Sequence, residues 1–231
     1  MKRIIILLAL IISNIVASAQ ETDVTKFLGI PIDGFKPQMI SKLKQKGFVQ
    51  SSNPDVLTGE FNGRDVEVSV VTNNNKVYRI FLEDAYYCSE ADIKIRFNNL
   101  CRQFDKNQKY IRANSLTSED GYTIPDKDDI SYEMSVHNKR YEASYWQAPE
   151  NVDTLAIQQQ MMDRVMAKYS KEELDNASEE TKTQILTEAL SYFYEIMSKK
   201  SVWFMINERG GRYGILMYYD NGYNQADGED L

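Results

Sequence analysis

The feature that most constrains the fold is the stretch DVLTGEFNGRDVEVSVVTNNNKVYRIFLED, residues 55–84. From Val66 to Val70 valines alternate with polar residues, which is the period of a strand with one buried face. Asn62-Gly63 and the asparagine run Asn73–Asn75 interrupt the stretch with residues that tolerate the positive φ of tight hairpin turns. The stretch therefore predicts a three-stranded antiparallel meander.

Helical periodicity flanks this meander on both sides. Upstream, apolar residues with helical spacing predict a short helix from Gln38 to Lys46, which Gly47 ends. Downstream, Ser89 and Asp92 have the spacing of a capping box, and a helix is expected from Glu90 to about Lys106. The first half of the chain is thus expected to run helix, three strands, helix.

The second half begins after a polar, turn-rich segment at residues 114–129. Alternation from Ile130 to Gln147 predicts strand, turn and strand, and a helical insert is expected at about 152–199. The stretches SVWFMIN and RYGILMYYD then predict a final hairpin. EFNGRDVEVSVV and SVHNKRYEASYW share an Asn-x-Arg turn followed by alternation, as a divergent duplication would leave.

Together these patterns predict an α+β fold in which antiparallel β-meanders pack with helices. The expected divisions are a signal peptide at 1–19, a first α+β lobe at 20–115 and a second α+β lobe at 116–231. The helical insert falls in the second lobe. Two divergent copies would fit the pattern, and the sequence leaves open whether the lobes share one sheet.

The first residues, MKRIIILLALIISNIVASAQ, have the three parts of a secretory signal peptide. Lys2 and Arg3 precede an apolar run from Ile4 to Ile12, and Ala17-Ser18-Ala19 has the small-residue pattern of a cleavage site. The run is shorter than the roughly 20 residues that cross a bilayer. We expect an exported protein, periplasmic or extracellular, with no transmembrane segment after cleavage.

Charge and cysteine usage limit the partners and the redox chemistry. The chain has 27 basic and 34 acidic residues, a net charge of −7 that becomes −9 once Lys2 and Arg3 are removed. Nucleic acid is not expected as a partner, because phosphate binding needs a concentrated basic surface. Cys88 and Cys101 are expected to stay unpaired, since the predicted helix between them holds their Cα atoms far beyond disulfide distance.

Catalytic motifs are missing from the sequence. The single histidine, His137, is expected at a hairpin turn, so Ser-His-acid and Cys-His sites cannot be assembled without it. Asp126, Asp128 and Asp129 lack the glycine and distal glutamate of a calcium loop and are expected in a solvated loop. We predict no catalytic residue, no metal site and no cofactor.

Aromatic residues are the unusual feature, with 15 tyrosines and 2 tryptophans. Near strands and strand ends, flat rings serve protein or sugar recognition. The candidate binding residues are Trp146, Trp203, Asp220 and Tyr223.

The final stretch, YYDNGYNQADGEDL, fails as a calcium loop because Tyr223 and Gln225 would occupy ligand positions that need oxygen acids. We expect the last strand to end at Tyr219, a turn at Asp220-Asn221-Gly222 and then a polar extension that does not pack. Changing Asp227, Glu229 and Asp230 to alanine is predicted to leave folding intact.

Three stretches carry a resemblance: FLGIPIDGFKPQMISKLKQKGF, GEFNGRDVEVSVVTNNNKVYRI and GILMYYDNGYNQADGEDL. They resemble a family of uncharacterised secreted proteins of Gram-negative gut anaerobes, which implies export and a small α+β build. Residues 27–83 also resemble the helix-plus-meander modules of BamE-type outer-membrane assembly lipoproteins and of β-lactamase-inhibitor proteins. This chain has no cysteine at the cleavage point for lipid attachment. The second resemblance implies binding to other proteins.

Three functions follow from these observations, beside a fourth interpretation as a structural or stress-related exported protein with no single ligand. The first is a secreted or periplasmic, non-enzymatic module that binds another protein through strand-end loops and aromatic side chains. The second is a glycan-binding protein in which Trp146, Trp203 or Tyr223 stacks on sugar rings. The third is a hydrolase that uses two carboxylates, which the many acids permit.

Overall fold

The computed structural model of the chain describes residues 23–115, 120–150 and 154–226. Contacts between Cα atoms divide it into two compact units. The sheet unit holds the described residues of Val24–Ala148 and Lys199–Leu231, and the helical unit holds those of Met1–Asp23 and Pro149–Ser198. The expected signal peptide, residues 1–19, lies outside the described residues.

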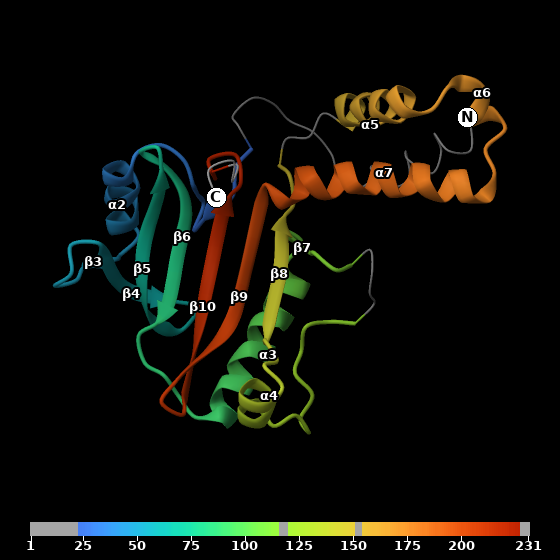
Figure 1. Cartoon of the computed structure of the whole chain (residues 1–231). Helices are drawn as coiled ribbons and strands as arrows, with labels where there is room; N and C mark the ends of the chain where they lie inside the picture. The colour runs from blue at the N-terminus through green and yellow to red at the C-terminus, as the bar shows by residue number, and fades with distance from the viewer. Residues whose placement is uncertain (1–22, 116–119, 151–153, 227–231) are drawn as a thin grey trace. The chain divides into compact units, whose positions relative to one another are not determined.

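The sheet unit is built on one antiparallel sheet (Figure 1), which confirms the predicted α+β class. Eight strands of its described residues follow the order β3-β4-β5-β6-β10-β9-β8-β7. The strands are β3 (Val49–Gln50), β4 (Val56–Phe61), β5 (Arg64–Asn73), β6 (Lys76–Asp84), β7 (Tyr110–Arg112), β8 (Glu142–Gln147), β9 (Lys200–Arg209) and β10 (Arg212–Asn221). A separate hairpin pairs β1 (Lys26–Phe27) with β2 (Ile30–Pro31).

The predicted meander is present as β4, β5 and β6. Its first turn has φ of 53° at Asn62 and 73° at Gly63, and its second has 45° at Asn74 and 64° at Asn75. Two successive residues with positive φ give the turn whose twist matches that of paired strands. The asparagines and glycine that predicted the hairpins are therefore the residues that shape them.

Helices cover one face of the sheet, called here the inner face. Helix α2 (Lys36–Gln45) buries Met39 and Leu43 against it, close to the predicted 38–46. Helix α3 (Glu90–Lys106) has the predicted bounds and buries Ile93, Phe97 and Phe104. Ser89 caps α3 by accepting a hydrogen bond from the backbone N–H of Asp92 at 3.2 Å.

The two halves of the sequence meet in the middle of this sheet. Strand β10 pairs with β6 on one side and with β9 on the other, so both halves bury side chains in one hydrophobic core. The compact units consequently change at residues 148/149 and 198/199, and not near residue 116. A shared core explains the difference, since strands of one sheet bury their inner faces against the same helices.

The segment Ile130–Val136 was predicted to be a strand, and it is helix α4. Asp129 caps the helix by accepting a hydrogen bond from the backbone N–H of Tyr132 at 2.8 Å. His137 is therefore the C-terminal cap of a helix and not part of a hairpin turn. The alternation was misleading because this short helix buries Ile130 alone and leaves Tyr132 and Val136 exposed.

The helical unit contains α5 (Thr154–Lys168), α6 (Lys171–Asp175) and α7 (Glu179–Ser198), close to the expected insert. Ser170 and Glu173 form a complete capping box at the start of α6. Two small apolar clusters hold the helices together, with Met161, Ala189 and Tyr192 buried in one and Val165, Leu174 and Ile185 in the other.

Both cysteines are free thiols, as predicted. Burial raises the pKa of Cys101 to about 12, which keeps this thiol protonated. In the described part of the chain, no helix has both the length and the apolar composition needed to cross a membrane.

The expected free extension after β10 is wrong for the residues that the structure describes. Asn221 is buried and donates a hydrogen bond to the backbone oxygen of Ile32 at 2.7 Å. Asn224 donates to the backbone oxygen of Val77 at 2.9 Å and to Asp33 at 2.8 Å. The polar side chains of this segment tie it to the sheet, so polarity did not imply solvation. Asp227, Glu229 and Asp230 lie outside the described residues.

Candidate binding site

The sheet has a second face, called here the outer face, that none of the described helices of the sheet unit covers. Along β9, Val202, Phe204 and Ile206 point inward and are buried. Their neighbours Trp203 and Met205 point outward and are half-buried. Strict alternation therefore places large apolar side chains on both faces of the same strand.

Three aromatic side chains form a row across the middle of the outer face. Strand register places Tyr218 of β10 opposite both Phe81 of β6 and Trp203 of β9. The ring centroids of Tyr218 and Trp203 are 3.9 Å apart with an interplanar angle of 13°, and those of Tyr218 and Phe81 are 5.0 Å apart. Leu216 and Met205, paired in the next row, extend the apolar surface. We call these five residues the aromatic band.

An ion pair fixes one side of the aromatic band. The carboxylate of Asp220 accepts two hydrogen bonds from Arg79, at 2.5 and 2.8 Å, and one from Nε1 of Trp203 at 3.1 Å. Asp220 is 3% exposed, and Thr25 donates to its backbone oxygen. The carboxylate is thus fully engaged within the protein and holds the indole ring in place instead of meeting a ligand.

Arg79 completes the arrangement by lying beside the rings. Its guanidinium carbon is 4.9 Å from the ring centroid of Tyr218 and 5.9 Å from that of Trp203. The hydrogen bonds that Arg79 donates to Asp220 raise the pKa of Arg79 above its usual value. Burial raises the pKa of the Tyr218 hydroxyl, so this ring stays neutral at physiological pH.

The stacking decides what the band offers to a ligand. One face of the Tyr218 ring is stacked on Trp203, and Phe81 and Arg79 also lie against this ring. Rings stacked on one another along a sheet present their edges to solvent. Such a surface suits apolar and hydrogen-bonding contacts from another protein better than the flat stacking of a sugar ring.

A polar cluster closes one end of the band. The Tyr87 ring lies on Gly214, where a Cβ atom would come within 2.7 Å of it. The Tyr87 hydroxyl donates to Glu83 at 2.9 Å and accepts from Asn207 at 2.7 Å, and Glu83 also pairs with Arg209 at 2.8 Å. Gly214 is therefore required because any side chain would displace the tyrosine.

Of the four candidate residues, the structure brings Trp203 and Asp220 into direct contact. Trp146 lies opposite Ser201, in the register row of Asp220 and not in that of Trp203, and its 5% exposure leaves little ring surface for a ligand. Tyr223 is 51% exposed and lies beyond the end of β10. The four candidates did not include Arg79, Phe81 or Tyr218, although Tyr218 is one of the strand aromatics from which they were drawn. The sequence did contain an indication of them. All three alternate with the buried residues of their strands, so they occupy positions that face away from the core.

The other candidate chemistries are not assembled. Asp128 accepts hydrogen bonds from Lys139 at 2.8 Å and Tyr141 at 3.3 Å, while Asp129 caps α4. His137 contacts Glu133 at 3.2 Å on the exposed side of that helix. Among the described residues, no group of three or more His, Cys, Asp or Glu side chains is placed to hold a metal ion.

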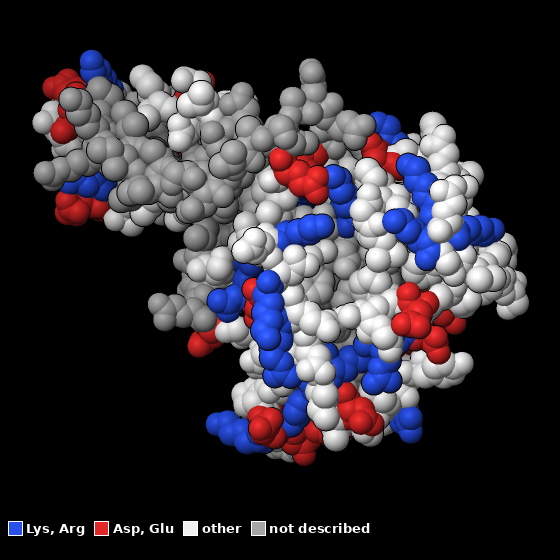
Figure 2. Space-filling model, turned by 180° about the vertical axis from the view of Figure 1, so that it is seen from behind, with Lys and Arg blue, Asp and Glu red and all other residues white. Residues whose placement is uncertain are grey.

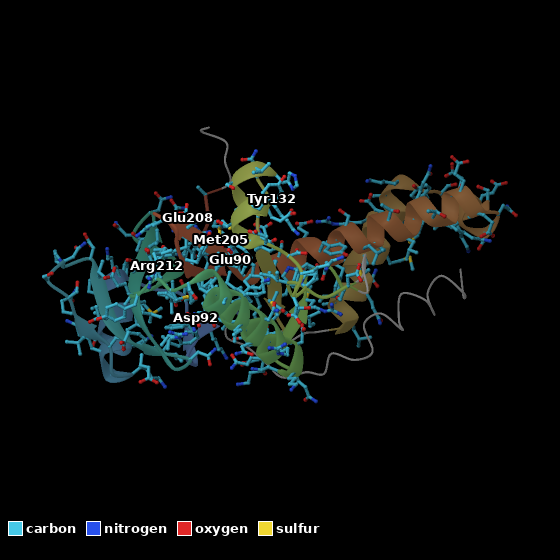
Figure 3. The ribbon with its side chains drawn as sticks, turned by 90° about the horizontal axis from the view of Figure 1, so that it is seen from below. Glu90, Asp92, Tyr132, Met205, Glu208 and Arg212 are labelled. Carbon is cyan, nitrogen blue, oxygen red and sulfur yellow. The ribbon has the colours of Figure 1, made fainter. Side chains whose placement is uncertain are left out.

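The end of the sheet unit beside α4 is formed by several elements. Figure 3 views the molecule from below and labels Tyr132 of α4, Glu208 of β9 and Glu90 at the start of α3. Glu90 accepts a hydrogen bond from the backbone N–H of Ile130 at 2.8 Å and so joins α3 to α4. Tyr132, 51% exposed, packs edge-on against His137 with centroids 5.2 Å apart.

One hollow contains several carboxylates, as a two-acid hydrolase would need. It has a volume of about 350 Å³ and is lined by Glu60, Asp65 and Asp84, among others. Asp84 is held by Arg96 through two hydrogen bonds and by the backbone N–H of Ile215 at 3.0 Å. Only the exposed Glu60 and Asp65 stay available, on strands at the rim of the hollow.

Compared with known proteins, the chain matches no family model, and no curated protein or solved structure is significantly similar to it.

Proposed function

We propose that the chain is an exported, non-enzymatic protein that binds another protein through the aromatic band of its sheet. The observation that carries the proposal is the row Phe81, Tyr218 and Trp203, half-buried on a sheet face that no described helix of the sheet unit covers. Tryptophan, tyrosine and arginine are the residue types that dominate protein–protein binding energy. The N-terminal sequence pattern supports export.

Preorganisation supports this use of the band. The ion pair between Arg79 and Asp220 and the hydrogen bond that Trp203 donates to Asp220 restrict the rotamers before any partner arrives. Binding then orders few additional side chains, which lowers the entropy that association must overcome. The partner is expected to present aliphatic side chains to the ring edges of the band.

The geometry favours a protein over a glycan as the ligand. Sugar binding by stacking requires an exposed ring face, and the faces of Tyr218 are occupied. In the 350 Å³ hollow, Asp84 is engaged within the protein, and the two remaining carboxylates, Glu60 and Asp65, are exposed to solvent at its rim. Neither alternative has an observation in its favour that equals the band.

A photo-crosslinking experiment tests the proposal. A photoreactive amino acid at Ser69, which lies next to Phe81 in strand register, should capture one defined protein from a cell-envelope fraction. The change Trp203→Ala should abolish this adduct, while Tyr86→Ala, an aromatic residue outside the band and 76% exposed, should leave it unchanged. An adduct that persists in Trp203→Ala, or none with the unmodified band, would exclude the band as the binding surface.

A further inference from the structure

A second surface lies on the opposite side of the sheet unit, beside α3. A hollow of about 200 Å³ is enclosed by the turn between β4 and β5 and by one side of α3. The helix contributes residues at spacings of three to four, which places them on one face. The polar side chains that line it are Asn62, Arg64, Asp92, Arg96, Asn99 and Gln103.

The amide groups in this hollow are oriented as donors. Asn62 donates its side-chain N–H to Oε1 of Gln103 at 2.5 Å, and Arg102 donates to Oδ1 of Asn99 at 2.7 Å. Because the carbonyl oxygens of Asn99 and Gln103 are engaged in these bonds, the NH₂ groups of these two residues are left to donate to a ligand. The hollow therefore offers N–H groups to a ligand that accepts hydrogen bonds.

The charges in the hollow favour an anion. Arg64 is exposed, and no carboxylate of the described residues lies within 4.0 Å of its guanidinium. The charge of Arg96, in contrast, is neutralised by its ion pair with Asp84. Asp92, the one carboxylate of the lining, accepts a hydrogen bond from the Ser89 hydroxyl at 2.7 Å. Figure 3 shows Asp92 at the start of α3, on the side away from Tyr132.

The wider surroundings of the hollow carry both signs of charge. Figure 2 views the molecule from behind, where Lys and Arg side chains are interspersed with Asp and Glu. Arg64 also lines the neighbouring hollow that contains Glu60, Asp65 and Asp84. Because the whole chain has a net charge of −7, attraction of an anion must come from the local donors and not from the long-range field.

We propose that this hollow binds a small oxyanion, a carboxylate or phosphate group, with Arg64 as the ionic anchor and the amides of Asn99 and Gln103 as hydrogen-bond donors. The planar fork of an arginine matches either group with two parallel hydrogen bonds. The hollow has no residue in common with the aromatic band. A failure of one proposal therefore does not affect the other.

Side-chain amide resonances provide the test. The mature chain labelled with ¹⁵N is titrated with inorganic phosphate and, separately, with acetate, against sodium chloride at matched ionic strength. The NH₂ signals of Asn99 and Gln103 should shift and saturate in at least one of the two titrations, and the titration that saturates identifies the group. No saturable shift in either titration would overturn the proposal.

Variants locate the effect. Arg64→Ala should weaken the apparent affinity roughly tenfold or more, since it removes a charge-assisted hydrogen bond. Asn99→Asp should abolish binding by replacing a donor with a carboxylate. Lys106→Ala removes the same charge from an exposed position of α3 outside the hollow and should leave the affinity unchanged. An equal loss in Lys106→Ala and Arg64→Ala would show that the ion only screens surface charge.

Discussion

Both faces of the central sheet carry aromatic side chains, but those on the inner face are buried in the core and those on the outer face are half-buried. On the inner face, Phe204 is fully buried, with its ring centroid 5.2 Å from Phe97 and 5.5 Å from Phe104. On the outer face, its neighbour Trp203 is half-buried and is held by Asp220. Aromatic content therefore does not distinguish the buried core from this half-buried outer surface. The difference is whether a helix or a polar anchor holds the ring.

The ionisable groups differ less between the two faces. The inner side buries Tyr145, Tyr219 and Cys101, and burial raises the pKa of each. Each face also holds a buried carboxylate paired with an arginine, Asp84 with Arg96 on the inner side and Asp220 with Arg79 on the outer face. A buried carboxylate on either face therefore has a charged partner.

The largest effect is expected from Phe204→Ala. The change leaves a cavity under α3 and should lower the free energy of unfolding by about 3–5 kcal/mol. Urea denaturation followed by circular dichroism measures it. A loss below about 1 kcal/mol would mean that the inner face is not the close-packed side of the sheet.

The second-largest effect is expected from alkaline pH, which should lower the free energy of unfolding through the buried groups of the inner face. The pKa of Cys101 is raised from 9.0 to about 12, and those of Tyr145 and Tyr219 are raised above 10.0. A raised pKa favours the protonated native form, so its stabilisation is complete below pH 9 and is lost as pH rises toward the native pKa. Cys101 alone accounts for about 2 kcal/mol between pH 9 and 11. Cys101→Ala should reduce this slope in urea titrations, and an unchanged slope would contradict its burial.

A smaller loss in the free energy of unfolding, about 1–3 kcal/mol, is expected from Asp220→Ala, because this change leaves Arg79 without its carboxylate partner. The double change Arg79→Ala with Asp220→Ala should be less destabilising than the sum of the single changes. Thermal denaturation of the four proteins gives the coupling energy. Strict additivity would mean that the ion pair does not organise the outer face.

Trp203→Ala should lower stability by only about 1–2 kcal/mol, because the ring is half-buried and loses mainly its stacking and one hydrogen bond. Its effect on partner capture should nevertheless be complete. Measured beside Phe204→Ala, it compares adjacent residues of one strand. Equal stability losses would remove the distinction between the two faces.

The smallest effect is expected from Tyr218→Phe. This change keeps the stacked ring and removes only a hydroxyl, so stability should change by less than about 0.5 kcal/mol. Crosslinking from Ser69 should also persist if ring edges provide the contact. Loss of the adduct with unchanged stability would assign the contact to the hydroxyl.

Local sequence determined a large part of this protein. The asparagine turns, the valine alternation and the Ser89 cap each act within a few residues, and they specified β4, β5, β6 and α3 with nearly correct bounds. The final hairpin followed from the same rule. Short segments were less certain, since Ile130–Val136 alternates like a strand and is helical once Asp129 caps it.

Only the tertiary structure decided how these elements combine. The pairing of Phe81 with Tyr218 joins residues far apart in sequence, and it turned two expected lobes into one sheet with one core. The same pairing brought Arg79 to Asp220 and so created the candidate site. Periodicity states that a strand has two faces, but register and the packing of α2 and α3 decide which face is buried, because those contacts depend on distant parts of the chain.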